Sequence, residues 1–295
     1  MNATITNSFI MSLALVGINM SMKFLFIFLM TKGEERKALK ISEGKSIVYE
    51  FTILFLITFL VVSILLSYQI ESLSITGIVL AIMIVSIIPT YNYLIDPIVK
   101  YRLTKNNDVT EKYRYLPIIN KQSIRIFESS SNVINAFATG VVPYSKTIIL
   151  GKTLAQVLKG NELEAVIYHE IGHLRSNHLL KLYLINLSVN AMGMVAFVFF
   201  VQEFIRNSSF APLWVGLYWA IMAAILIFFS SAYQRRFEKE ADLFSAKSTT
   251  GSDIINALKR IDELTNGKAS KKALNYPSLK NRIQHVERKL LENIN

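Results

Sequence analysis

The sequence predicts an α-helical protein that crosses a membrane several times and carries a smaller α+β domain outside the bilayer. Three observations predict this class. The 295 residues are 52% hydrophobic and only 18% charged, whereas a typical soluble chain carries about 25% charged residues. Five stretches are long and apolar enough to span a bilayer, which takes ~20 residues of helix. The basic residues, which give the chain a net charge of +11, are confined to a few segments.

The five apolar stretches are expected to be membrane helices. They lie at about 8–30, 51–70, 72–95, 182–202 and 207–234. The first three form an N-terminal membrane region, 1–95, and the last two form a membrane hairpin, 182–234. Lys23 alone interrupts the first stretch, which has no basic segment before it and no small-residue cleavage site. It is therefore expected to be a retained helix and not a signal peptide.

The basic residues predict the topology. Thirty of the 32 lysines and arginines lie in segments 31–46, 96–181 and 235–295, and the exceptions are Lys23 and Arg206. Because cytoplasmic loops are rich in Lys and Arg, we expect the N-terminus outside and the segments 96–181 and 235–295 in the cytoplasm, packed together. The basic excess then reflects topology and contact with the lipid bilayer, and a nucleic-acid partner is not expected.

Segment 96–181 contains three short stretches in which apolar and polar residues alternate. They are Ser123–Phe127, Val133–Ala138 and Lys146–Leu150. Such alternation between turn-forming residues is typical of strands. We expect a small sheet in which these strands pair antiparallel.

A helix with metal-ligand spacing follows the strands. Asn161 is a good N-cap with Glu164 three residues later, as in a capping box, and apolar residues then recur at helical spacing. His169 and His173 lie four residues apart on one face, so both imidazoles can reach one tetrahedral Zn²⁺, and Glu170 beside them can act as a general base. A chance match is the alternative, but two of only four histidines in the chain fall in this pattern.

A catalytic zinc needs a third protein ligand and an open position. The chain has no cysteine. A histidine ten residues after His169 would complete one common pattern, but that position is Leu179. His178 is one residue out of this register and is expected to face solvent or the membrane. A carboxylate is therefore the expected third ligand.

Three carboxylates after the fifth apolar stretch are the first cytoplasmic candidates. Glu238 and Asp242 are four residues apart on one predicted helical face. One of them can ligate zinc while the other orients a ligand histidine through its second ring nitrogen. Glu240 points away from both and is expected to be solvated. The alternative is an ordinary charged helix start below a membrane segment.

Four motifs together resemble those of the integral-membrane gluzincin proteases that include HtpX and the type 1 CAAX prenyl protease. They are NAFATG at 135–140, HEIGH within 161–178, RRFEKEAD at 235–242 and YPSLKNRI at 276–283. The resemblance covers roughly the last 180 residues. It implies a cytoplasmic α+β gluzincin-type domain with one Zn²⁺ per chain, Glu238 as the third ligand and Asp242 as the orienting carboxylate. HtpX-like members usually have two membrane helices before the catalytic segment, whereas three are expected here.

The resemblance also implies further site residues. In the family a His-Pro histidine and an arginine six residues later lie near the zinc, and the matching residues are Tyr276 and Arg282. A phenol can donate a hydrogen bond to a developing oxyanion; the alternative is a helix-start Tyr-Pro and a surface arginine. A strand of Asn135, Ala136, Phe137 and Ala138 is implied to bind an extended substrate through its backbone, and an ordinary sheet is the alternative.

The resulting functional prediction is a multi-pass protein of a bacterial plasma membrane. It would be a zinc-dependent endopeptidase that cleaves membrane-associated proteins or peptides at the cytoplasmic face, in quality control or precursor processing. A signalling metalloprotease of the BlaR/MecR type is an alternative, although no segment expected outside is long enough for a sensor domain. A non-catalytic membrane scaffold is the other alternative, although no expected catalytic residue is missing.

Overall fold

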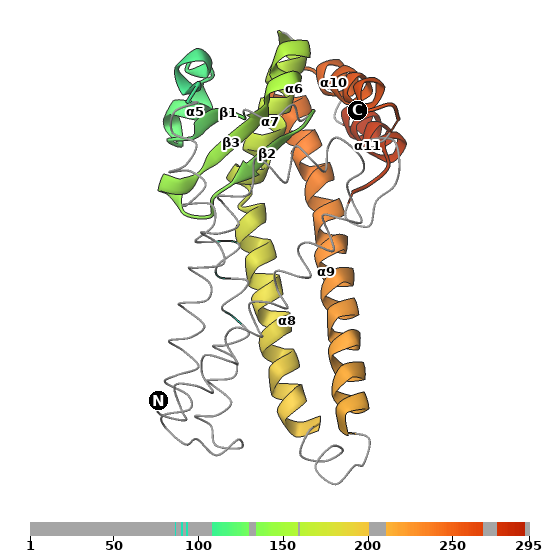
Figure 1. The fold of residues 1–295 in the computed structure, drawn as a ribbon. Helices are drawn as coiled ribbons and strands as arrows, with labels where there is room; N and C mark the ends of the chain where they lie inside the picture. The colour runs from blue at the N-terminus through green and yellow to red at the C-terminus, as the bar shows by residue number, and fades with distance from the viewer. Residues whose placement is uncertain are drawn as a thin grey trace. The chain divides into compact units, whose positions relative to one another are not determined.

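The computed structural model describes residues 108–129, 134–158, 160–200, 211–267 and 276–292, together with Ser86, Thr90 and Tyr93 (Figure 1). The three expected N-terminal membrane helices, at about 8–30, 51–70 and 72–95, lie outside the described residues apart from those three positions. The chain divides into two compact units. One comprises Met1–Asn92 and Asn186–Ala224, and the other comprises Tyr93–Ile185 and Ile225–Asn295.

The second unit contains a three-stranded sheet. Its strands are β1 (Arg125–Ser129), β2 (Ala136–Thr139) and β3 (Thr147–Gly151), in the order β1-β3-β2. The three strands are found where alternation predicted them, and β2 pairs antiparallel with β3 as expected. The expected antiparallel pairing of β1 is wrong, because β1 runs parallel to β3. Alternation shows which face a side chain takes but not which way a strand runs, and the two chain reversals around β2 leave β3 running in the same direction as β1.

The core of this unit lies between the sheet and the helix that carries the HEIGH motif. Every residue of the central strand β3 is buried. Ile126 of β1 pairs with Ile148 of β3, and both are fully buried in one cluster with Ile167 and Ile171 of α7 (Asn161–Arg175). The sheet thus provides an apolar surface that holds one side of α7.

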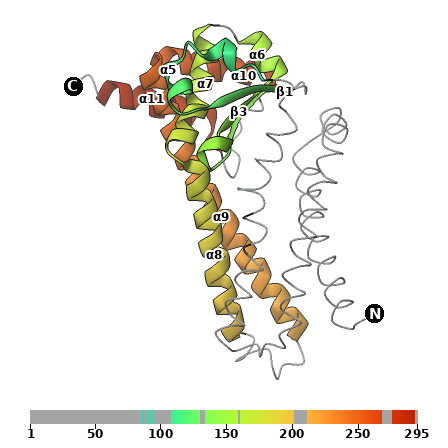
Figure 2. The ribbon, with the colours of Figure 1, turned by 90° about the vertical axis from the view of Figure 1, so that its left-hand side faces the viewer.

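Shorter elements and two further helices complete the described part of this unit (Figure 2). The short elements are the 3-10 helices η3 (Thr110–Tyr113) and η4 (Pro143–Ser145) and the helices α5 (Pro117–Lys121) and α6 (Lys152–Val157). The longer helix α10 (Gly251–Leu264) packs against α7 and against α11 (Leu279–Glu292). Thr250 begins α10 with a capping box, in which its side chain and that of Asp253 each accept from the other's backbone N–H.

Helix α7 is confirmed, but its beginning differs from the expected cap. Gly160, not Asn161, is the N-cap residue, and its φ of +57° lies in the left-handed region that favours glycine. Its carbonyl accepts a hydrogen bond from the backbone N–H of Glu164 at 3.1 Å. The Glu164 carboxylate accepts a hydrogen bond from the Tyr115 hydroxyl at 2.7 Å and so ties the start of α7 to the segment before the sheet.

Two long helices leave this unit, α8 (His178–Phe200) and α9 (Ala211–Ser248). Among the described residues, one helix is long and apolar enough to cross a membrane, His178–Phe197, with a mean hydropathy of 1.4. It corresponds to the expected fourth stretch. The expected fifth stretch, 207–234, falls partly on α9 and partly outside the described residues, so the number of five membrane helices stays a prediction.

Apart from Ser86 and Thr90, the described residues of the first unit belong to the apolar parts of α8 and α9. The Tyr218 hydroxyl of α9 donates to the backbone carbonyl of Gly193 on α8, and its ring packs against Phe197. The Asn190 side chain donates to the carbonyl of Asn186 one turn earlier, at 2.7 Å. These polar groups are therefore satisfied within or between the two helices, as an apolar environment requires.

Helix α7 and the last turns of α9 approach closely at Gly172. A Cβ atom placed on Gly172 would lie 3.1 Å from Cα of Ala241 and 3.2 Å from Cβ of Phe244. About two helical turns away from this contact, on the N-terminal side of α7, the buried Ser245 hydroxyl of α9 donates to the Ala165 carbonyl at 2.6 Å. The absence of a side chain at position 172 is what allows the two backbones to meet.

Replacing Gly172 with valine should destabilise the protein by ~1–3 kcal/mol, since the branched side chain has no room against Ala241 and overpacking a tight contact costs that much. Thermal and denaturant unfolding of the purified protein measures the effect. The control is Gln156→Val, at an exposed position of α6, where only a few tenths of a kcal/mol of helix propensity are at stake. Equal stability of the two variants would show that the close contact is not required.

Candidate metal centre

Six segments of the second unit line one cavity of about 430 Å³. They are β2 with the residue before it, helix α7, the start of α8, the C-terminal part of α9, helix α10, and the start of α11 with Tyr276 and Pro277 before it. Every sequence-predicted site residue except Asp242 lines this cavity. Asp242 lies directly behind it and is fully buried. The fold therefore brings together residues that the sequence holds in four separate motifs.

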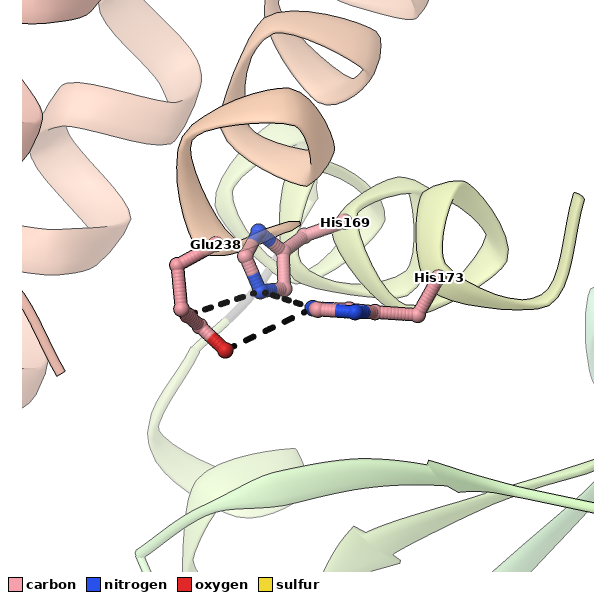
Figure 3. A group of neighbouring side chains, drawn as sticks. All are labelled: His169, His173 and Glu238. Carbon is pink, nitrogen blue, oxygen red and sulfur yellow. Dashed lines mark hydrogen bonds and ion pairs between the residues drawn. The ribbon is translucent and has the colours of Figure 1, made fainter. Parts of the chain in front are cut away.

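Three of these residues point their ligand atoms at one another (Figure 3). The Nε2 atoms of His169 and His173 are 3.3 Å apart. The two carboxylate oxygens of Glu238 lie 3.6 Å from these atoms, Oε2 from His169 and Oε1 from His173. A tetrahedral ion with bonds of ~2.1 Å holds its ligand atoms about 3.4 Å apart. The spacing and the two-nitrogen, one-oxygen donor set therefore fit a single ion of the size and preference of Zn²⁺.

Asp242 and Arg282 support this group from behind. The Nδ1 atom of His169 lies 2.9 Å from Oδ1 of Asp242. Arg282 donates to both carboxylate oxygens of Asp242, from Nε at 2.8 Å and from Nη2 at 2.6 Å. Its third nitrogen, Nη1, lies 3.4 Å from Oε2 of Glu238. Arg282 is thus not a surface arginine, because only 14% of its side chain is exposed and it is paired with both carboxylates of α9.

Burial and neighbouring charges shift the ionisation of the site. Burial raises the pKa of the Glu170 carboxyl to about 7, although His169, Arg282 and a hydrogen bond from the Ala138 backbone oppose this rise. Burial would also raise the pKa of Asp242, but the charge and hydrogen bonds of Arg282, with His169, hold it well below its usual range. Asp242 is therefore a permanent anion, whereas Glu170 can exchange a proton near neutral pH.

Tyr276 enters the cavity just before α11. Burial and the nearby carboxylates of Glu238 and Glu170 raise the pKa of its phenol above the ordinary value of 10.0. The hydroxyl therefore keeps its proton and can act as a hydrogen-bond donor at neutral pH. The residue as a whole remains 45% exposed, so its side chain is accessible to a molecule that enters the cavity.

Strand β2 presents part of its backbone to the cavity. The Gly151 N–H donates to the Asn135 carbonyl at 2.9 Å, and Phe137 pairs with Ile149 further along. Because hydrogen-bonded residues alternate in an antiparallel pair, the backbone groups of Ala136 and Ala138 point away from β3. Among the strands that the structure describes, β2 has a neighbour on one side only. The expected strand is thus an edge strand of the described sheet, and it lines the same cavity as His169, His173 and Glu238.

His178 is the main site residue that the sequence analysis misplaced. It is buried, with 1% of its surface exposed, and its Nδ1 lies 3.0 Å from Nδ1 of His173. The expected position assumed a continuous helix. Instead α7 ends at Arg175, Asn177 adopts a φ of +52°, and α8 begins at His178, so the chain turns and brings this imidazole back toward α7. An asparagine soon after the HEIGH motif is a sequence signal for such a helix end.

Glu240 is also less isolated than expected. Its Oε2 accepts from Nε2 of His178 at 3.1 Å, and its Oε1 accepts from Nε of Arg236 at 2.8 Å. Its side chain is 37% exposed, so it is partly solvated. The helical spacing correctly turns it away from Glu238 and Asp242, but that side of α9 faces the start of α8.

The chain is similar to known proteins in sequence and in fold. Residues 116–290, more than half of the chain, match peptidase family M48. A protein named protease HtpX homolog from Fusobacterium nucleatum is 31% identical over 144 residues, which are 48% of this chain and 47% of that protein. Protease HtpX of Alcanivorax borkumensis is 30% identical over 138 residues, 43% of this chain and 46% of that protein. The chain spans about half the length of these curated relatives.

A solved structure shows the same fold. The crystal structure of S. mikatae Ste24p superposes with a TM-score of 0.64 at 18% identity, over 85% of this chain and 67% of that one. These comparisons confirm the resemblance inferred from the four motifs. Since the match to the family covers the sheet, α7, the end of α9 and most of α11, the chain belongs to peptidase family M48.

Proposed function

We propose that this chain is a membrane-embedded zinc endopeptidase that cleaves membrane-associated polypeptides at the cytoplasmic face. One observation carries the proposal: the His169–His173–Glu238 group, in which His169 and Glu238 are buried and His173 is half-buried, adjoins Glu170 in a cavity that an edge strand also lines. M48 metalloproteases are zinc-dependent in general, and the curated relatives are named as proteases. The apolar helix His178–Phe197 and the confinement of basic residues to three segments support the membrane location and the cytoplasmic face.

The residues of the cavity suit peptide hydrolysis. Zinc held by His169, His173 and Glu238 would polarise the scissile carbonyl. It would also lower the pKa of the attacking water, so that this water can be deprotonated at neutral pH. Glu170, with its pKa near 7, is suited to take a proton from the attacking water and return it to the leaving amine. The Tyr276 hydroxyl would donate a hydrogen bond to the carbonyl oxygen as it becomes negative, since this residue lines the cavity.

The substrate would bind as an extended segment along β2. Ala136 and Ala138 direct their backbone groups away from β3, where the Ala138 backbone also forms a hydrogen bond with Glu170, and Asn135 and Phe137 line the cavity as well. Pairing through the backbone tolerates many sequences, which suits an enzyme that degrades damaged membrane proteins or processes a membrane-anchored precursor. Arg282 would hold both carboxylates of α9 in place, because it donates two hydrogen bonds to Asp242 and forms an ion pair with Glu238.

Zinc content tests the metal assignment. The purified protein should contain about one zinc per chain by elemental analysis, and His169→Ala should lose it, because two remaining ligands bind the ion too weakly. His285→Ala is the matched control, since His285 lies on α11 outside the ligand group, and it should keep the zinc. Equal zinc in the His169→Ala variant and the parent would contradict the site, and parent protein without zinc would favour a scaffold.

Replacing Glu170 with glutamine should keep the zinc and reduce cleavage by ~10²–10⁴-fold, the usual contribution of a general base. Membranes from cells that express the parent or the variant are compared by proteomics of peptide termini. Termini present only with the parent would give both the substrates and the cleavage preference. The control is Glu162→Gln, on the same helix but away from the cavity. Identical termini from Glu170→Gln and the parent would contradict the role of Glu170 as the general base.

Replacing Tyr276 with phenylalanine should lower kcat by ~10²–10³-fold with little change in KM, as loss of one oxyanion donor does. Turnover of a peptide from the proteomic screen is the measurement. Tyr144→Phe, at a position that is 70% exposed, serves as the control. Undiminished turnover of the Tyr276 variant would mean that the phenol takes no part in catalysis.

A further inference from the structure

The two ligand histidines are held by different partners on their second ring nitrogens. Nδ1 of His169 faces the Asp242 carboxylate at 2.9 Å. Nδ1 of His173 instead faces Nδ1 of His178 at 3.0 Å. This second contact is not required by the peptidase chemistry described above, and it comes from the first residue of a different helix, α8.

The proton inventory of this contact has one consistent solution. A histidine that offers Nε2 to a metal carries its proton on Nδ1, so the His173 Nδ1–H must donate to an acceptor. Nδ1 of His178 can accept only if the proton of that ring is on Nε2. Nε2 of His178 lies 3.1 Å from Oε2 of Glu240, which accepts this proton. In this relay of hydrogen bonds, His173 donates to His178 and His178 donates to Glu240. Nε2 of His173 then carries no proton and can bind a metal.

The surrounding residues fix the His178 ring in this orientation. It stacks on Phe237 with the ring centroids 4.2 Å apart and the planes within 7°. The Lys181 ammonium lies over the Phe237 ring, 5.7 Å from its centroid. Glu240 is held in turn by Arg236 at 2.8 Å. The imidazole is thus constrained by stacking on one face and by hydrogen bonds at both nitrogens.

We propose that His178, oriented by Glu240, is a positioning residue that fixes the tautomer and ring orientation of the metal ligand His173. The inference rests on the proposed function, because it requires His173 to bind zinc. The neutral imidazole of His178 accepts the hydrogen bond from His173 without adding a buried charge. The negative charge of the relay resides on Glu240, which is partly exposed and paired with Arg236, so the site avoids a further buried carboxylate beside Glu170, Glu238 and Asp242.

Two substitutions at position 178 distinguish the effect of the hydrogen-bond acceptor from the effect of the aromatic ring. His178→Phe keeps an aromatic ring for stacking on Phe237 but removes the acceptor. His178→Asn loses the ring, but its Oδ1 is bonded to Cγ as Nδ1 is in histidine and so can still accept from His173. Zinc affinity is measured by competition with a chromophoric chelator on the full chain in detergent, carrying Glu170→Gln so that peptidase activity plays no part. The thermal midpoint of the metal-free protein is recorded alongside.

We expect His178→Phe to weaken zinc binding by ~10–100-fold, the usual cost of losing the partner of a ligand histidine. His178→Asn should retain most of the affinity, and the metal-free midpoint of His178→Phe should stay close to that of the parent. Zinc affinity of His178→Phe equal to the parent would overturn the proposal. So would an equal loss in His178→Asn, because it would show that the ring and not the acceptor matters.

A second variant keeps the test independent of folding at the buried position. Glu240→Ala, at a partly exposed site, should weaken zinc binding by a smaller factor than His178→Phe, and unchanged affinity would overturn the relay. Its control is Glu263→Ala, because Glu263 likewise pairs with an arginine of its own helix, Arg260. A parent that binds no zinc would overturn the proposed function and this inference with it, whereas a zinc-binding parent with an unaffected His178→Phe variant would overturn this inference alone.

Discussion

The close approach of α7 to the last turns of α9 is the constraint on which the site depends. His169 and His173 come from one helix and Glu238 and Asp242 from the other, and the two pairs are separated in sequence by all of α8 and most of α9. They meet only because the glycine between the two histidine-bearing turns lets the α9 backbone come within contact distance. The buried hydrogen bond from Ser245 to Ala165 fixes the register of the two helices. A larger residue at the contact would separate the nitrogen ligands from the oxygen ligand without altering any of them.

Charge pairing is the second condition for this arrangement. Glu238 and Asp242 are both buried, and burying anions costs several kcal/mol each unless they are paired. Arg282 of α11 meets both of them, so a helix far along the chain is needed to stabilise the carboxylates of α9. Each ligand histidine then has its outer nitrogen occupied, His169 by Asp242 and His173 by His178. The inner nitrogens and the Glu238 carboxylate form a set of electron-pair donors that is suited to a cation.

Local patterns in the sequence predicted the elements well and picked out side chains that the fold brings together, but they predicted the long-range arrangement poorly. Alternation located the three strands, and helical spacing identified His169, His173, Glu238 and Asp242, because both signals are periodicities of a single element. The direction of β1 and the placement of His178 were wrong for a common reason. Each depends on how the chain turns between elements, and the left-handed Asn177 that redirects the chain before α8 leaves only a weak signal in composition. Arg282 was found through the family motif, since no spacing within α11 reveals its pairing with α9.

The edge position of β2 has a consequence for what such an enzyme could recognise. A strand that binds through its backbone requires a partner whose own N–H and C=O groups are unpaired, and a helix or an interior strand has none to offer. Selection would then depend on how often a segment of the target opens, which is a property of its local stability. Two proteins with the same cleavable residues would differ in lifetime according to their opening free energies. The edge strand Ala136–Thr139 would in this way let a protease select substrates by their local stability and not by their amino-acid sequence.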